Sequence, residues 1–262
     1  MRSGLFAVIV LLGICRICAA QEIKCPGTYG GHLQGLATDE ELNSYWSFTV
    51  EIVKTDKTGK ILASVEAPNH QGDLTYVDGK VYVAVNLGRF NREPGEADSW
   101  VYVFDAEDLE LLSKKEVPEL VHGAGGMAYH DGKFVIIGGL PEGYNENYVY
   151  EYDKDLNFIQ RHVIASGYTR LGIQTACWFD GAWWFGCYER EGGLLKTDED
   201  FNLLGRYNPN YAVGIAPWKD GTCLRGVSIR IDDEERRRWA GKAVVDTPGK
   251  NPREASGSAG AE

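Results

Sequence analysis

A hairpin centred on an aspartate–glycine turn recurs along this chain. Its clearest copy spans residues 69–86, where alternating β-branched and aromatic runs lie on both sides of Asp78-Gly79. Asp-Gly suits a tight two-residue turn because glycine, and to a lesser degree aspartate, tolerates positive φ. Further copies lie at 122–139, 171–187 and, shortened, 211–226, and a degenerate first copy lies at 32–48.

A second pattern follows each hairpin: an aromatic or β-branched strand runs into aspartate, and a short return strand comes next. Alternation with period two places one face of each strand against a neighbouring unit. A self-similar all-β unit of about 40 to 50 residues is typical of a propeller blade, not of a solenoid coil. The sequence therefore predicts an all-β fold, a five-bladed β-propeller of four-stranded antiparallel blades, over residues 21–245. The second pattern spans 48–68, 100–118, 148–164, 193–208 and, less regularly, 227–245.

The two ends of the chain differ in composition from the repeats. Residues 1–20 combine Arg2, an apolar run and the small pair Ala19-Ala20, which is the pattern of a secretory signal peptide and is too short to span a bilayer. Residues 246–262 carry Pro, Gly, Ser and charge without apolar periodicity, so we expect a disordered tail. The sequence thus predicts a secreted or periplasmic protein without a membrane span.

The net charge of the chain excludes some classes of binding partner. The formal net charge is -11. An acidic surface repels phosphate backbones, so nucleic acid is not an expected partner. We expect a monomer that binds a small polar ligand or a peptide end.

Export to an oxidising compartment would leave four cysteines after cleavage, and these allow three pairings. With a two-residue turn at Asp180-Gly181, Cys177 lies opposite Trp184 and Cys187 opposite Gln174, so the two sulfurs point to opposite faces. A closed ring brings first and last repeats together, which favours a Cys25–Cys223 disulfide; buried free thiols are the alternative. Whether the fifth blade uses its own outer strands or borrows one from residues 21–31 stays open.

Polar residues gather where the innermost strands begin. His32, His70 and His122 each lie at such an entry, and these entries ring one mouth of a propeller's central channel. This mouth predicts either a divalent metal held by these three imidazoles or a polar ligand anchored by Arg170. Polar lining of a water-filled channel is the plain alternative. The predicted ligand-binding residues are His32, Gln34, His70, Gln71, His122, Arg170 and Gln174.

Other features have structural interpretations. Trp178, Trp183 and Trp184 fit core packing between blades better than a sugar-stacking platform. His130 and His162 are expected at the surface. Two long connections, 87–99 and 140–147, emerge at one rim and would form the contact surface of an interaction scaffold.

The repeats resemble those of the glutamine cyclotransferase family, the plant and bacterial type of glutaminyl cyclase. The matches are short: Gln34-Gly35-Leu36, Gly72 with Leu74 and the Asp78-Gly79 hairpin, Trp178 with Asp180-Gly181, and Gly214-Ile215-Ala216. The resemblance implies an acyltransferase in which Gln34 and Gln174 orient the substrate amide.

This chain differs from the family at the positions of the family's catalytic residues. The position of the family's proton-transferring glutamate is Gln71, and Gln174-Thr175 stands where the family favours Asn-Glu. Asp73 is therefore the candidate catalytic acid or base. A third possibility is a metal-dependent lyase or hydrolase that acts on a saccharide.

Overall fold

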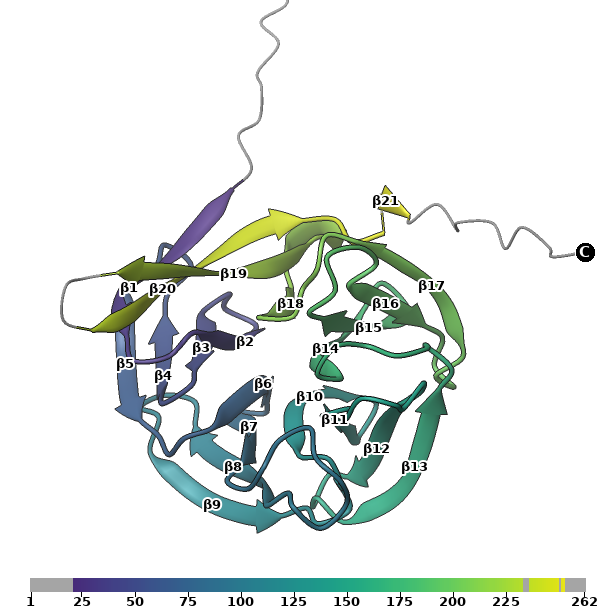
Figure 1. Cartoon of the computed structure of the whole chain (residues 1–262). Coiled ribbons are helices and arrows are strands. Elements are labelled where there is room, and N and C mark those ends of the chain that lie inside the picture. Colours follow the sequence, from purple (N-terminus) through teal and green to yellow (C-terminus); the bar gives the residue numbers. More distant parts are fainter. Residues whose placement is uncertain (1–20, 233–235, 250, 253–262) are drawn as a thin grey trace, which may run out of the picture.

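Five antiparallel blades surround a central axis in the computed structural model of the protein, which describes residues 21–232, 236–249 and 251–252 (Figure 1). The predicted five-bladed propeller of four-stranded blades is confirmed. The predicted signal peptide at 1–20 lies outside the described residues. Across the part of the chain that the structure describes, no helix has the length and apolar character needed to cross a membrane.

The first four blades follow the chain from the axis outward. Blade 1 contains β2 (Leu33–Thr38), β3 (Ser44–Phe48), β4 (Glu51–Thr55) and β5 (Ile61–Glu66). Blade 2 contains β6 (Gln71–Val77), β7 (Lys80–Asn86), β8 (Ser99–Asp105) and β9 (Leu111–Glu116). Blade 3 contains β10 (Ala124–His130), β11 (Lys133–Gly138), β12 (Asn147–Asp153) and β13 (Phe158–Ile164). Blade 4 contains β14 (Ile173–Phe179), β15 (Ala182–Cys187), β16 (Leu194–Thr197) and β17 (Leu203–Asn208).

The fifth blade is built from both ends of the chain. Its inner strands are β18 (Ile215–Pro217), β19 (Cys223–Asp232) and β20 (Arg237–Asp246), and its outermost strand is β1 (Glu22–Tyr29), which pairs with β20. Figure 1 shows β1 beside β20 at the edge of this blade. The question of closure is thereby answered: the blade borrows its fourth strand from the N-terminal segment.

The inner turns have the expected backbone. In blades 2, 3 and 4 two residues join the paired strands, and both have positive φ, as at Asp78 (48°) and Gly79 (76°). Such turns match the right-handed twist of the strands, and glycine adopts positive φ without a steric cost. The recurring Asp-Gly pairs therefore set the register of these hairpins.

An aspartate at or directly after the end of the third strand organises the outer turn in blades 1–4. Asp153 illustrates this: its Oδ1 accepts hydrogen bonds from the backbone N–H groups of Asp155 (2.9 Å) and Asn157 (2.8 Å). The fourth residue of this turn, Leu156, has positive φ (56°). An aspartate that bonds its own backbone two residues on is a turn former. This explains why each repeat runs into aspartate before its return strand; the four residues are Asp56, Asp105, Asp153 and Asp198.

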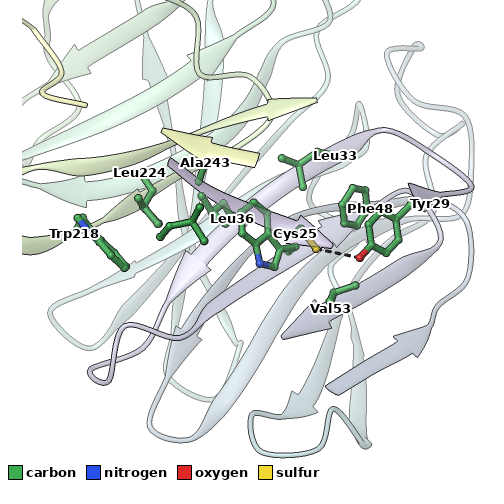
Figure 2. Packing of buried hydrophobic residues seen from close by; sticks show 12 residues of the cluster. Cys25, Tyr29, Leu33, Leu36, Phe48, Val53, Trp218, Leu224 and Ala243 are labelled. Carbon is green, nitrogen blue, oxygen red and sulfur yellow. Dashed lines mark hydrogen bonds between the residues drawn. The ribbon is translucent and has the colours of Figure 1, made fainter. Parts of the chain in front are cut away.

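The core lies between the blades. Five clusters of buried side chains each join two adjacent blades, so the ring has one cluster for every interface. Trp183 packs between blades 3 and 4, and Trp184 between blades 4 and 5, which confirms their core role. Figure 2 shows the cluster that joins blade 5 to blade 1, in which the rings of Tyr29 and Phe48 stack with centroids 3.8 Å apart.

The predicted disulfide is wrong. Cys25, Cys177, Cys187 and Cys223 are all buried free thiols, and the Cys25 sulfur lies 3.1 Å from the Tyr29 hydroxyl (Figure 2). The strand register gives the reason: Cys25 pairs with Gly241 of β20, whereas Cys223 pairs with Asp246 at the far end of the same strand. The ring is therefore fastened by strand pairing and packing.

Two further sequence predictions need correction. Cys177 does lie opposite Trp184, but Cys187 lies opposite Ile173, because a bulge shifts the register by one residue. The predicted disordered tail begins too early: Asp246 ends β20, and β21 (Asn251–Pro252) pairs with β17 as a fifth strand of blade 4. The rest of that segment, residues 250 and 253–262, lies outside the described residues.

A buried carboxylate crosses blade 3. Glu151 on β12 accepts hydrogen bonds from Lys133 (2.5 Å) on β11 and from His162 (2.6 Å) and Gln160 (3.0 Å) on β13. Burial opposes its ionisation, but these three bonds outweigh burial and lower the pKa of Glu151 to about 2. His162, expected at the surface, is thus a half-buried partner of this carboxylate.

Ring closure by β1 makes a stability prediction. Ile23→Ala should lower the protein's free energy of unfolding by about 2–5 kcal/mol, because Ile23 is buried in the cluster between blades 5 and 1. Lys24→Ala, at the exposed neighbouring residue, should lower the free energy of unfolding by less than about 0.5 kcal/mol. Urea denaturation measures both, and equal effects would show that β1 is not docked.

Glu151 predicts a pH dependence. Because its pKa is about 2 in the folded protein against an ordinary 4.5, its stabilising contribution is present above pH 4.5 and disappears as the pH falls toward 2. Glu151→Gln should lower stability at pH 7 and flatten the stability profile between these values. Denaturation at several pH values tests this, with Glu110→Gln as an exposed control; identical pH profiles for Glu151→Gln and the wild type would contradict it.

Candidate functional site

β-Bulges place the polar side chains at the channel mouth. The inner strands of blades 1 to 4 each lose register near their first residues, for example between Leu33 and Gly35 in β2 and between Ile173 and Thr175 in β14. The extra residue in these two bulges is a glutamine, Gln34 or Gln174. A bulge re-aims its side chain relative to the regular alternation, and both glutamines line the same pocket.

This channel-mouth pocket has a volume of about 700 Å³. Its walls come from blades 1, 2, 4 and 5 and from the loop after β7. Five of the seven predicted ligand-binding residues line it: His32, Gln34, His70, Arg170 and Gln174. The remaining lining residues are Phe90, Leu171, Tyr188, Asn210, Val213, Arg225, Gly226, Val227, Ser228 and Trp239.

The two histidines of the pocket are neutral hydrogen-bonding groups. Burial lowers the pKa of His32 and of His70, and their proximity lowers that of His32 further. The Gln34 amide donates to His70 Nε2 at 2.8 Å, and His32 Nε2 lies 3.1 Å from the Tyr188 hydroxyl. Burial raises the pKa of Tyr188 to about 12, so this hydroxyl keeps its proton at neutral pH. The network orients all four side chains without adding charge.

Positive charge in the pocket comes from two arginines. Arg225 on β19 forms an ion pair with Asp246 (3.2 Å), which does not line the pocket, while the backbone N–H of Arg170 donates to Glu189 (2.7 Å). Among the described residues that line the pocket, no aspartate or glutamate is present. The charged side chains of the lining are therefore the two arginines, and Arg225 already shares its charge with Asp246.

The pocket also offers acceptors and an apolar wall. Gln34 and Gln174 are only 4% and 6% exposed, and among the described residues neither side-chain carbonyl oxygen has a hydrogen-bond donor. Phe90, Leu171 and Trp239 supply apolar surface beside them. Convergent polar groups on a mostly apolar hollow are typical of small-ligand sites.

Gln71 and His122 lie outside the pocket. Gln71 is fully buried, and its amide donates to the Pro68 carbonyl (2.5 Å). The His122 Nδ1 lies 2.7 Å from the Arg92 carbonyl oxygen, and its ring packs on Tyr144. Among the described residues, no three His, Cys, Asp or Glu side chains are grouped so that they could hold a metal ion. The geometry therefore does not support the predicted three-histidine metal site of His32, His70 and His122.

Asp73 is the central cross-link of the ring. It is fully buried on β6, and its two oxygens accept the backbone N–H groups of Leu36 (3.1 Å) on β2 and Ala176 (3.0 Å) on β14. Burial raises the pKa of Asp73 well above its ordinary value, although its backbone donors act in the opposite direction. Its predicted catalytic role stays a prediction, because Asp73 does not line the pocket.

Two glycines make room for Asp73. A Cβ at Gly35 or Gly126 would lie 2.4 Å and 2.8 Å, respectively, from atoms of this aspartate. Asp73 therefore contacts the inner strands of blades 1 and 3 as well as bonding to blade 4, and no larger residue fits at the two glycine positions.

The sequence did not indicate the pocket residues of blade 5 or of the rim loop. Arg225, Ser228 and Trp239 line the pocket from β19 and β20. Phe90 lines it from the long loop after β7, one of the two connections expected at the rim. Loop length marked that segment, but its fold back to the mouth had no sequence signal.

Comparisons with known proteins give only distant likenesses. No protein-family model matches the chain, and no curated protein does. A solved structure of a protein of unknown function from Bacteroides caccae has a TM-score of 0.47 and 13% identity over 79% of this chain and 82% of its own. BamB from Moraxella catarrhalis has a TM-score of 0.41 and 12% identity, with 87% of this chain and 67% of its own covered. The Dos1 propeller has a TM-score of 0.41 and 13% identity, with 79% of this chain and 54% of its own covered. The assignment as a five-bladed β-propeller follows from the chain's own strand pairing.

The position of Asp73 predicts a large stability loss on truncation. Asp73→Ala leaves the Leu36 and Ala176 N–H groups without their acceptor, at about 1–3 kcal/mol each, so unfolding should become easier by at least about 2 kcal/mol. Thr75→Ala, on the same strand and half-buried, is the control. Urea denaturation measures the free energy of unfolding of both variants. An equally small loss in Asp73→Ala and Thr75→Ala would contradict the role of Asp73 as a cross-link.

Proposed function

We propose that this protein is an exported binding protein that holds a small carboxylate-bearing ligand, such as a peptide end, at the mouth of its propeller channel. The observation that carries the proposal is the pair Arg170 and Arg225 in a hollow whose described lining contains no carboxylate. Arginine presents a planar fork of donors that matches a carboxylate. The apolar wall next to it fits an uncharged side chain.

The electrostatics favour a small anion over a polyanion. The whole chain is acidic, with a net charge of -11, so a nucleic acid or an anionic membrane surface is repelled. A small carboxylate entering the mouth meets the local arginines instead. The carbonyl oxygens of Gln34 and Gln174 add acceptors for an amide N–H. A carboxylate next to an amide and an apolar side chain describes the C-terminal residue of a peptide.

Turnover receives less support than binding. A cyclotransferase of the resembled family would place Gln34 and Gln174 on the substrate amide, and both do line the pocket. The acid or base assigned to Asp73 lies outside that lining, however, and so do Gln71 and His122. We therefore propose binding as the function, and turnover of an N-terminal glutaminyl peptide is the assay that would overturn this preference.

Binding of a minimal ligand tests the proposal. N-acetylphenylalanine carries a carboxylate, an amide and an aromatic side chain. N-acetylphenylalanine amide is the matched control ligand, in which an uncharged amide replaces the carboxylate. Charged hydrogen bonds contribute about 1.5–3 kcal/mol, so calorimetry should show the acid binding about 10- to 100-fold more tightly than the amide.

Two arginine variants make the test specific. Arg170→Gln should bring the affinity for the acid close to that for the amide. Arg161→Gln, on the outer strand β13, should leave both affinities unchanged, since Arg161 packs on Tyr148 far from the pocket lining. Equal binding of acid and amide by the wild type, or no binding of either, would contradict the proposal.

A further inference from the structure

The rim loops of blades 2 and 3 enclose a second hollow, which we call the rim groove. Its volume is about 670 Å³, close to that of the channel-mouth pocket. The two hollows share Phe90, Arg170 and Leu171, so they lie next to each other. The rest of the rim groove is formed by residues 91–93, 96, 140–142 and 168.

The rim groove is held in shape by hydrogen bonds between the two loops and the blades. The backbone N–H of Asn91 donates to the His122 carbonyl (3.0 Å), and the Leu140 N–H donates to the Asn91 side chain (3.0 Å). The hydroxyl of Tyr144 donates to Glu93 (3.1 Å), which joins the loop of blade 3 to that of blade 2. A groove with these bonds is preformed, so a ligand does not need to order it.

Phe90 connects the groove to the channel. Its ring lies roughly parallel to that of His70, with centroids 6.5 Å apart. A Cβ at Gly123 or Gly125 would lie 2.6 Å or 3.0 Å from this ring. The glycine-rich start of blade 3 thus leaves space for Phe90. Its ring lines both hollows, as does the side chain of Leu171.

The two hollows differ in their charged lining. The channel mouth presents arginines without a lining carboxylate, whereas the rim groove has Glu93, Glu96 and Glu142 together with Arg92 and the shared Arg170. Glu96 is already paired with Arg89 (3.0 Å). Among the described residues Glu142 has no ion-pair partner and is exposed. A ligand that spans both hollows therefore meets arginine at the mouth and the carboxylate of Glu142 at the far end.

We infer that the channel mouth and the rim groove form one extended site for a short peptide, with its C-terminal carboxylate at the mouth and an upstream basic side chain in the rim groove. The inference rests on the proposed function for the carboxylate end. It adds a polarity, a direction and a preference for lysine or arginine. Phe90 and Leu171 lie at the junction and contact the apolar part of the backbone between the two charged groups.

The test uses acetylated tetrapeptides that end in phenylalanine, measured by calorimetry in low salt. The parent peptide has three alanines before the phenylalanine. In the series, lysine or glutamate replaces each alanine in turn, so that the charged side chain is tested at three distances from the C-terminal carboxylate. A surface charge pair contributes about 0.2–1 kcal/mol, so at one position lysine should bind up to about fivefold more tightly than alanine, and glutamate more weakly. The preference should shrink in 0.5 M salt.

Variants of Glu142 assign the preference to the groove. Glu142→Gln should reduce the lysine preference, and Glu142→Lys should reverse it in favour of glutamate. Glu146→Gln, an exposed glutamate of the same loop that does not line the groove, should keep it. Circular dichroism confirms that each variant is folded.

The outcomes separate the two proposals. If the parent acid binds more tightly than its amide but lysine gives no preference at any position, the extended site is wrong while the proposed function stands. If lysine peptides bind equally well as acids and as amides, the carboxylate end is wrong. If the lysine preference persists in Glu142→Lys, the basic side chain does not bind in the rim groove and the inference fails.

Discussion

The carboxylate of Asp73 joins parts of the chain that are far apart in sequence, and the channel mouth is built around it. Its oxygens accept N–H groups from blades 1 and 4, while its own strand belongs to blade 2. Leu36 and Ala176 belong to innermost strands, which pair on one side only, so their N–H groups can face Asp73. In the same two strands, bulges turn Gln34 and Gln174 toward the pocket.

Much of the fold was predictable because it depends on local chemistry. Asp-Gly pairs require positive φ and give two-residue turns, and strand alternation follows from the packing of each blade on the next. The origin of the fourth strand in blade 5 was not predictable, since β1 and β20 are separated by almost the whole chain. The disulfide prediction failed for the same reason: it assumed a proximity that only the register between distant strands decides.

The candidate site was predictable in part. His32, His70 and Arg170 were found from their place at strand entries, and the pocket contains them. Gln34 is the extra residue of a bulge whereas Gln71 pairs with Val85, and because the sequence does not reveal where a bulge falls, the two could not be separated. One lines the pocket and the other is buried against Pro68. The contributions of Phe90 and Trp239 come from a loop and from a blade that closes across the ends of the chain, and neither has a local signal.

Closure through β1 also determines when the site can exist. Arg225, Ser228 and Trp239 belong to β19 and β20, which are synthesised after the first four blades, and the strand that completes their blade is among the first residues described. Contacts between such distant segments form late, because loop closure must precede them. During synthesis the first four blades can stack while the pocket still lacks one wall. The pocket is thus complete only when blade 5 has formed, and until then the ring is open on one side.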